Sequence, residues 1–241
     1  VEARWQIENG YYMYRDKFKF NAEPATVKLG EPKFPAGKIK DDEFFGKVET
    51  YRSEVKILIP VEAMGVPVVF NPAPVLESPV RTADDVARLH VPDPALETGF
   101  VLDAIRTLSR ELADDVPVIG FAGAPFTLAS YAIEGGGSRN YAHTKRLMYA
   151  QPEAFHALMS RLVDVTADYL NGQIDAVVEA VQVFDSWVGN LAPEDYRASV
   201  LPHMQELFRR ISGRVPVVNF STGTSGFLEL VSAAGGDVVG L

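Results

Sequence analysis

Residues 61–241 alternate short apolar runs with helical patterns. Four runs have the length and apolarity of strands that are buried on both faces: 116–121, 177–184, 215–220 and 238–241. Before and between these runs, apolar residues recur every three or four positions, as on the buried face of a helix, at 102–108, 155–170, 201–211 and 228–231. This order of strands and helices predicts an α/β fold built on a parallel sheet.

Residues 1–59 follow a different pattern, one that favours β-structure. Residues 1–7 alternate apolar and polar side chains, and Glu8-Asn9-Gly10 is a hairpin-turn signal. Aromatic residues that favour strands follow this signal: Tyr11, Tyr12, Tyr14, Phe18 and Phe20. Residues 55–59 have the pattern of a further short strand. We therefore predict two segments, a β-rich leader over 1–59 and an α/β segment over 60–241.

The charges support a boundary near residue 60. Residues 1–60 carry 11 basic and 10 acidic side chains, whereas residues 61–241 carry 12 basic and 22 acidic ones. Lysine use nearly stops at this point, because Lys145 is the one lysine after residue 60. A change of this kind indicates two segments of different origin.

The composition narrows the classes of function. Apolar residues make up 47% and charged residues 23% of the 241 residues, as in folded globular proteins. The net charge of −9 disfavours nucleic-acid binding, and no apolar run approaches the roughly 18 residues of a membrane span. The chain has no cysteine, which excludes disulfides, thiolate nucleophiles, zinc–cysteine sites and iron–sulfur clusters.

The densest motif is GFAGAPFTLASYAIEGGGS, residues 120–138, which follows a predicted strand and opens a helix. Gly123 and the run Gly135-Gly136-Gly137 allow close approach of the backbone and exposed amides, which suit carboxylates or phosphates. The motif has neither the Gly-Lys-Ser/Thr ending of a P-loop nor the G-x-G-x-x-G spacing of dinucleotide-binding folds. A plain tight turn is the alternative interpretation.

Two other polar motifs end predicted strands. They are Phe184-Asp185-Ser186-Trp187 and the run Ser221 to Gly226. In parallel barrels the polar residues at the carboxyl ends of strands face the active site, although helix capping explains both motifs equally well. The four histidines show no metal-binding spacing in the sequence, so we predict no metal site.

Residues from about 60 to 241 resemble the uroporphyrinogen decarboxylase family. The matching stretches are IPVEAMG (59–65), SPVRTADDVARL (78–89), residues 120–138, QVFDSWVG (182–189), and GTSGFLEL to GGDVVGL (223–241). The resemblance implies a (β/α)₈ barrel of the TIM type, here incomplete, that uses no cofactor. It also implies a cytoplasmic carboxy-lyase of porphyrin (haem) biosynthesis that converts uroporphyrinogen III to coproporphyrinogen III, with a homodimer as one arrangement.

The resemblance assigns two residues to substrate. Tyr131, in SYAIEGGGS, and Ser186, in FDSW, correspond to positions of that family that contact the tetrapyrrole, while the catalytic residues of this chain stay unknown. The family's arginine-bearing R-Q-A-G-R-Y motif does not occur here. Lys56-Ile57-Leu58-Ile59 stands where the family has F-S-D-[IV], whose aspartate faces the pyrrole N–H groups. We therefore expect impaired decarboxylation.

The ends of the chain also depart from the family pattern. The chain begins at Val1 with no initiator methionine or signal peptide, so we expect a piece or a processed product. The last third of the family pattern, with its G-H-G histidine, would lie beyond Leu241. Arg81 and Arg139 are the arginines near the matched motifs that could substitute for the missing ones.

The leader resembles the N-terminal domain of the bacterial thiol:disulfide interchange protein family. RWQIENGYYMYRDKFKF (4–20) and DDEFFGKVETYR (41–52) carry this resemblance, which implies an immunoglobulin-like, periplasmic β-sandwich. Without cysteine, thiol exchange is chemically impossible. An alternative function for the chain is therefore a non-catalytic, chimeric or interaction module. A corrinoid methyltransferase is a third hypothesis, which the absence of cysteine opposes because those enzymes use thiolate–zinc chemistry.

Overall fold

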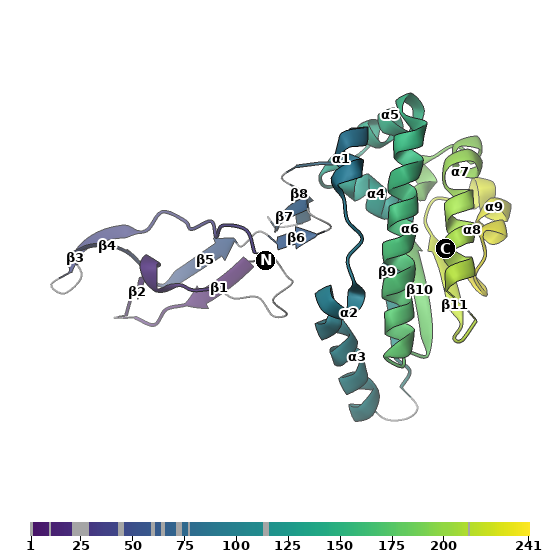
Figure 1. The fold of residues 1–241 in the computed structure, drawn as a ribbon. Helices are drawn as coiled ribbons and strands as arrows, with labels where there is room; N and C mark the ends of the chain where they lie inside the picture. Colours follow the sequence, from purple (N-terminus) through teal and green to yellow (C-terminus); the bar gives the residue numbers. More distant parts are fainter. Residues whose placement is uncertain are drawn as a thin grey trace. The chain divides into compact units, whose positions relative to one another are not determined.

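The chain divides into two compact units, Val1–Ser78 and Pro79–Leu241, in the computed structural model (Figure 1). The structure describes residues 2–9, 11–20, 29–42, 46–58, 61–63, 66–70, 74–76, 78–112, 116–211 and 213–241. The predicted segment boundary between residues 59 and 60 lies outside the described residues and stays a prediction.

The first unit is β-rich, as predicted, and its strands are antiparallel. Strand β1 (Glu2–Gln6) pairs with β5 (Glu54–Leu58). Strands β2 (Met13–Tyr14), β3 (Lys38–Asp42) and β4 (Gly46–Tyr51) form a sheet of order β2-β4-β3, with the 3-10 turn η1 (Arg15–Lys17) after β2. A third sheet joins β6 (Val61–Ala63), β7 (Val66–Phe70) and β8 (Pro74–Leu76).

The hairpin predicted at Glu8-Asn9-Gly10 is wrong. Gly10 itself lies outside the described residues, but β1 pairs with β5, and β2 pairs with β4 instead of β1. A turn does form, since the Tyr11 N–H donates to the Glu8 carbonyl at 3.0 Å, but it does not pair β1 with β2, because β1 pairs with a segment about fifty residues away. This pairing buries the side chains of Ile7, Tyr51, Val55 and Ile57, and the rings of Trp5, Phe18, Phe20 and Phe34 pack around them. The leader thus has a small aromatic core.

The second unit carries the predicted α/β pattern. Its first half consists of α1 (Ala83–Arg88), α2 (Pro94–Glu97), α3 (Gly99–Glu111), β9 (Ile119–Gly123), α4 (Pro125–Glu134), α5 (Ala142–Ala150) and α6 (Pro152–Asp175). Its second half consists of β10 (Ala180–Asp185), η2 (Val188–Asn190), α7 (Pro193–Ser199), α8 (Leu201–Arg210), β11 (Val217–Ser221), η3 (Ser225–Phe227), α9 (Leu228–Ala234) and β12 (Val238–Gly240).

These strands form one parallel sheet of order β12-β11-β10-β9. Strand neighbours in space are neighbours in sequence, each pair joined through helices, which is the winding of a (β/α)₈ barrel. The predicted α/β class is confirmed, and the sheet corresponds to part of such a barrel. The four apolar runs seen in the sequence became β9, β10, β11 and β12.

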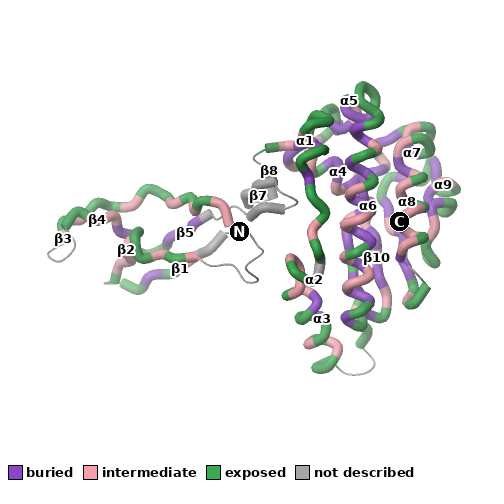
Figure 2. Tube along the Cα trace, viewed as in Figure 1, coloured by how far each residue is buried: buried purple, intermediate pink, exposed green. Residues whose placement is uncertain are grey.

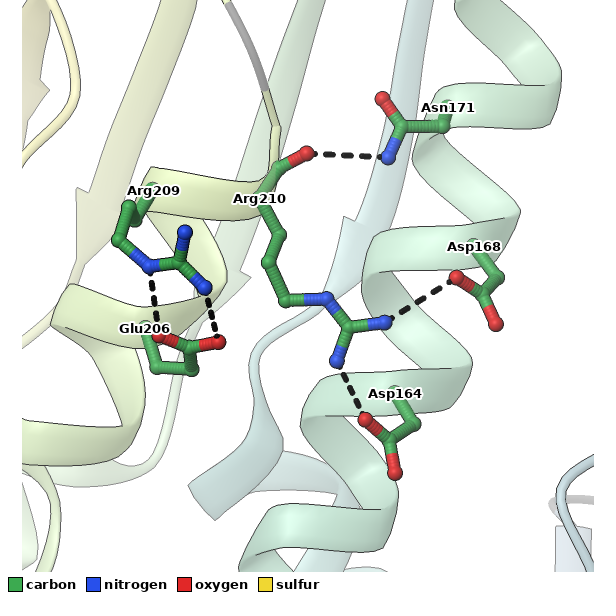
Figure 3. A network of polar contacts seen from close by, with 6 residues as sticks. All are labelled: Asp164, Asp168, Asn171, Glu206, Arg209 and Arg210. Carbon is green, nitrogen blue, oxygen red and sulfur yellow. Dashed lines mark hydrogen bonds and ion pairs between the residues drawn. The ribbon is translucent and has the colours of Figure 1, made fainter.

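Helix α6 supplies much of the core. Figure 2 shows a buried stripe along this helix, which packs against β9, β10 and α8. Its fully buried side chains include Phe155, Leu158, Met159 and Leu170. Polar contacts also join the end of α8 to α6 (Figure 3). The Arg210 guanidinium forms ion pairs with Asp164 and Asp168, and the Asn171 side-chain amide donates to the Arg210 carbonyl.

The opposite face of the sheet is apolar and open. Along β9 the burial alternates, so that Gly120 and Ala122 are buried while Ile119 and Phe121 are 57% and 62% exposed. Phe121, Phe184 and Phe220 form an edge-to-face row across three strands, with ring centroids 5.9 and 5.2 Å apart. We call this row and Ile119 the open sheet face. Exposed apolar surface of this kind favours association.

We expect the full chain to self-associate through the open sheet face. Replacing Phe121 by Thr, which keeps a strand-favouring residue, removes a largely exposed ring and should weaken association at least about tenfold. Sedimentation velocity over a concentration series measures this effect. Leu108→Thr, at an exposed site on α3, is the control and should leave association unchanged. A monomeric parent chain with one cooperative unfolding transition would contradict the prediction.

Two histidines that lie far apart in the sequence meet between α6 and α8. His156 Nδ1 and His203 Nε2 are 2.8 Å apart, and the rings stack with centroids 5.1 Å apart. Burial, with the neighbouring His156, lowers the pKa of His203 to about 4. One ring nitrogen must donate and the other accept, so the contact requires a neutral acceptor.

The unfolding free energy should therefore fall between pH 6.5 and pH 4. In this window the unfolded chain protonates His203 while the folded chain does not, so acidification favours unfolding. The half-buried site suggests a loss on the order of 2 kcal/mol. Urea titrations of the parent and of His203→Leu across this window measure both unfolding free energies. The parent value minus the variant value should fall steadily as the pH falls, because only the parent carries His203. His143→Leu, at an exposed site, is the control. A pH-independent difference for His203→Leu would refute the prediction.

Candidate functional site

The carboxyl ends of β9, β10 and β11 lie side by side. In the parallel register Gly123 is opposite Phe184, and Asp185 is opposite Ser221. The chain therefore brings together the segments that follow three successive strands: the start of α4, the turn that leads into η2, and the loop that leads into η3. All three polar motifs found in the sequence contribute to this edge, which we call the carboxyl edge of the sheet.

Asp185 is the buried charge-bearing group of this edge. Its side chain ends β10 and only 2% of the residue is exposed. Oδ1 accepts a hydrogen bond of 2.8 Å from Thr127 Oγ1, whereas Oδ2 is buried without a hydrogen-bond partner among the described residues. Burial raises the pKa of Asp185 to about 7, and the hydroxyl and backbone N–H of Thr127 oppose this rise. The N-cap residue of α4, Ala124, has no side chain that could accept from the free N–H groups of the first turn. The Asp185 carboxyl takes this role by accepting from Thr127.

Two tyrosine rings pack against Trp187, which lies two residues after Asp185. The rings of Tyr131 and Trp187 are 4.0 Å apart between centroids and inclined by 34°, and Tyr141 lies 5.3 Å from Trp187. Tyr131 remains 37% exposed, so its ring is available from solvent. The backbone N–H of Trp187 donates to Thr127 Oγ1 at 3.3 Å. Because Trp187 follows Ser186 directly, this stack brings the two predicted substrate residues, Tyr131 and Ser186, to the same region of the edge.

The loops after β10 and β11 touch through their backbones. Thr222 Oγ1 donates to the Ser186 carbonyl at 2.5 Å. A Cβ on Gly189 would lie 2.3 Å from the Thr222 carbonyl oxygen, which is far inside van der Waals contact. Glycine at position 189 is therefore what lets the two loops meet.

Three of the four hydroxyls in the run Ser221 to Gly226 form hydrogen bonds within the protein. Ser221 Oγ and Thr224 Oγ1 are buried and 2.8 Å apart, so they hydrogen-bond to each other. The Thr222 hydroxyl is engaged with the Ser186 carbonyl. These contacts support the interpretation of this motif as a structural turn that shapes the edge.

The glycine run closes helix α4. Gly135 has φ of 85°, a left-handed conformation that glycine adopts without cost, and it ends the helix. The Arg81 guanidinium donates to the carbonyls of Ile133 and Glu134 at the same helix end. Arg81, one of the two arginines proposed to replace the family motif, is thus engaged as a helix cap, and Arg139 is exposed.

A concavity elsewhere in this unit is basic. It has a volume of about 250 Å³ and is lined by Arg81, Thr82, His143, Arg146, Leu147 and Gln151. Its positive charge could attract an anion, but its lining contains neither Tyr131 nor Ser186. The described residues contain no group of three or more His, Asp or Glu side chains arranged for a metal ion. Nor do they include a helix long and apolar enough to cross a membrane.

Sequence reasoning missed two residues of the edge, Thr127 and Tyr141. A threonine in the first turn of a helix that follows a strand is a usable signal, because such a side chain can bond groups at the helix start. Tyr141 carries no such signal, since only the fold places it on Trp187. The structure leaves the proposed roles of Tyr131 and Ser186 toward a substrate as predictions.

Comparison with known sequences supports both resemblances. The sequence profile of uroporphyrinogen decarboxylase (URO-D) matches residues 43–241, and that of the N-terminal part of the thiol:disulfide interchange protein DsbD matches residues 1–75. The uroporphyrinogen decarboxylases of Carboxydothermus hydrogenoformans and Geobacter metallireducens are 53% and 50% identical over 188 and 186 residues. Each match covers 77% of this chain and 54% or 55% of the relative, so the chain spans about half the length of these relatives.

A solved structure shares the fold. A methyltransferase from Methanosarcina mazei aligns with a TM-score of 0.59 over 71% of this chain and 51% of its own. Its sequence is 15% identical, so this likeness concerns the fold alone. It agrees with the α/β architecture of residues 79–241.

Proposed function

We propose, since the chain belongs to the uroporphyrinogen decarboxylase family, that the carboxyl edge of its sheet binds uroporphyrinogen. The observation that carries this proposal is the contact of Tyr131 with Trp187, the residue that directly follows Ser186 in the chain. Both residues follow parallel strands, at the end where barrel enzymes build their sites. The two hydroxyls are hydrogen-bond donors for the substrate's carboxylates, and the aromatic stack offers apolar surface to a pyrrole ring.

The reaction proposed for this edge is the loss of carbon dioxide from the acetate side chains of the tetrapyrrole. A proton adds to a pyrrole carbon, and the cationic ring then accepts the electron pair of the carbon–carboxylate bond as that bond breaks. A second proton then adds to the exocyclic carbon, which becomes a methyl group, and the first proton leaves the pyrrole carbon to restore the ring, so that one net proton replaces each released carbon dioxide. The ring itself is the electron sink, and the protein's contribution is positioning and electrostatic stabilisation, with no cofactor proposed.

This chain should perform the reaction poorly. The sequence lacks the arginine motif of its family. The Arg81 guanidinium, which could substitute for it, instead donates to the Ile133 carbonyl at the end of α4. A net charge of −9 opposes the approach of a polyanionic substrate. We therefore propose an impaired uroporphyrinogen decarboxylase-like carboxy-lyase, cytoplasmic in the manner of its family. It retains binding of the substrate but has a low rate of decarboxylation.

A second candidate is a non-catalytic, chimeric interaction module. The match of residues 1–75 to the thiol:disulfide interchange protein favours this candidate, as does the aromatic core of the leader. Redox exchange is not part of it, because the chain has no cysteine. A homodimer is compatible with either candidate. Binding of a tetrapyrrole distinguishes the first candidate from the second.

Removing the two edge hydroxyls should weaken binding of uroporphyrin, the stable oxidised form of the substrate. We expect Tyr131→Phe and Ser186→Ala each to raise the dissociation constant at least about tenfold, because a hydrogen bond to a charged group is worth about 1.5 kcal/mol or more. The shift of the porphyrin absorption band on titration measures binding. Tyr11→Phe and Ser232→Ala, at exposed positions in other parts of the chain, are the matched controls. Equal affinities for all four variants and the parent would exclude these residues from the site.

A further inference from the structure

The Thr127 hydroxyl connects three segments of the carboxyl edge. It donates its one proton to Asp185 Oδ1 at 2.8 Å, and it accepts the backbone N–H of Trp187 at 3.3 Å. A hydroxyl has a single donor and two acceptor positions, so the bond to Asp185 leaves its lone pairs for Trp187. One further bond, from the Ala124 amide to the Phe184 carbonyl, ties the start of α4 to the end of β10.

We propose that Asp185 is a positioning residue that, through Thr127, fixes the backbone of Trp187 against helix α4 and so sets Ser186 beside Tyr131. Asp185 ends β10, Thr127 and Tyr131 lie on α4, and Trp187 contacts both of them. The carboxyl is too deeply buried to touch a ligand itself. Only the identity of the ligand rests on the proposed function; the positioning rests on the geometry.

The charge of the carboxyl should control this contact. A charged acceptor binds a hydroxyl more strongly than a neutral one, so ionised Asp185 holds Thr127 more firmly than its protonated form does. The pKa of about 7 lets both forms be populated near neutral pH. The unpartnered Oδ2 is the oxygen free to carry the proton, because Oδ1 accepts from Thr127.

The surroundings of the carboxyl contain few other titratable groups. Among the described elements packed against β10, strand β9 has no ionisable residue, and neither has the buried face of α6. The side chains that face it from α4 and β11, Thr127 and Ser221, do not titrate. Tyr196 on α7 is a phenol whose pKa is raised by burial and by the Asp185 charge, so it stays neutral near pH 7. A transition near pH 7 at this edge would therefore belong to Asp185.

Trp187 provides a direct readout. The chain has two tryptophans, so a Trp5→Phe full chain reports on Trp187 alone. We expect its fluorescence to change with a midpoint near pH 7. Asp185→Asn in this background should abolish the transition, and Thr127→Val should abolish it as well, because the hydroxyl that links the carboxyl to Trp187 is gone. Thr127→Ser keeps that hydroxyl and should retain the transition, as should Asp195→Asn, which removes a carboxylate on α7 that Tyr149 contacts.

A ligand titration gives the second readout. Thr127→Val should raise the dissociation constant for uroporphyrin about tenfold, and Thr127→Ser should stay within about twofold of the parent. A Trp5→Phe chain without a pH transition, or a transition that survives in Thr127→Val, would overturn the proposal; the first of these outcomes needs no substitution at the carboxyl edge. Failure of the parent to bind uroporphyrin would overturn the proposed function alone, because the fluorescence titration still decides the role of Asp185.

Discussion

Incubated without oxygen in the presence of uroporphyrinogen, the full chain should form coproporphyrinogen at least about 10³-fold more slowly than a full-length family enzyme. Loss of one preorganised electrostatic group costs about 10² to 10³ in rate. This sequence lacks the R-Q-A-G-R-Y motif, and it has Lys56-Ile57-Leu58-Ile59 in place of F-S-D-[IV]. Because such losses are not additive, the factors for the missing groups are not multiplied. The upper value for one group is therefore taken as the minimum loss.

Chromatography of the oxidised products measures this turnover. The uroporphyrinogen decarboxylase of Carboxydothermus hydrogenoformans, 53% identical over the shared region, is the positive control. Turnover comparable to that of the control would show that the missing groups are not the ones that the chemistry needs. In that case the search for catalytic residues would begin with the described polar groups of the carboxyl edge.

Replacing Gly189 by alanine should have the largest effect on the site itself. The new Cβ would lie 2.3 Å from the Thr222 carbonyl oxygen and 2.7 Å from the Gly223 Cα, and both are backbone atoms that cannot rotate away. The loops after β10 and β11 must then separate, which costs about 1–3 kcal/mol of the unfolding free energy. Because Ser186 is held by Thr222, we expect uroporphyrin affinity to fall at least about tenfold.

Gly226→Ala is the matched control for this substitution. Gly226 lies in the 3-10 turn η3, as Gly189 lies in η2, and a Cβ there meets nothing within 4 Å. Urea unfolding and porphyrin titration of both variants measure the two effects. Gly189→Ala with the stability and affinity of Gly226→Ala would show that the contact between the loops does not shape the site.

The strands and the longer helices of residues 79–241 were predictable because their signals are local. Apolar runs such as 116–121 and the three- or four-residue spacing of α6 depend only on neighbouring residues. The helical pattern at 201–211 became α8, and the structure places a separate short helix, α7, before it. The polar residues that follow the 177–184 and 215–220 runs likewise predict the carboxyl edge from the sequence alone.

Non-local contacts were not predictable. The partner of β1 is β5, about fifty residues away, so the turn that the Glu8-Asn9-Gly10 signal indicates forms without joining the two strands of a hairpin. His156 and His203, separated by 47 residues, became neighbours only when α6 packed on α8. The bond between Thr127 and Asp185 spans 58 residues. Each of these contacts depends on the register of packed elements, which neighbouring residues do not encode.

A structure of the full chain with uroporphyrin bound tests the central claim most directly. The account predicts that the macrocycle lies at the carboxyl edge, with carboxylates within hydrogen-bond distance of the Tyr131 and Ser186 hydroxyls. A macrocycle bound instead in the basic cavity lined by Arg81, His143 and Arg146, with the edge empty, would contradict it.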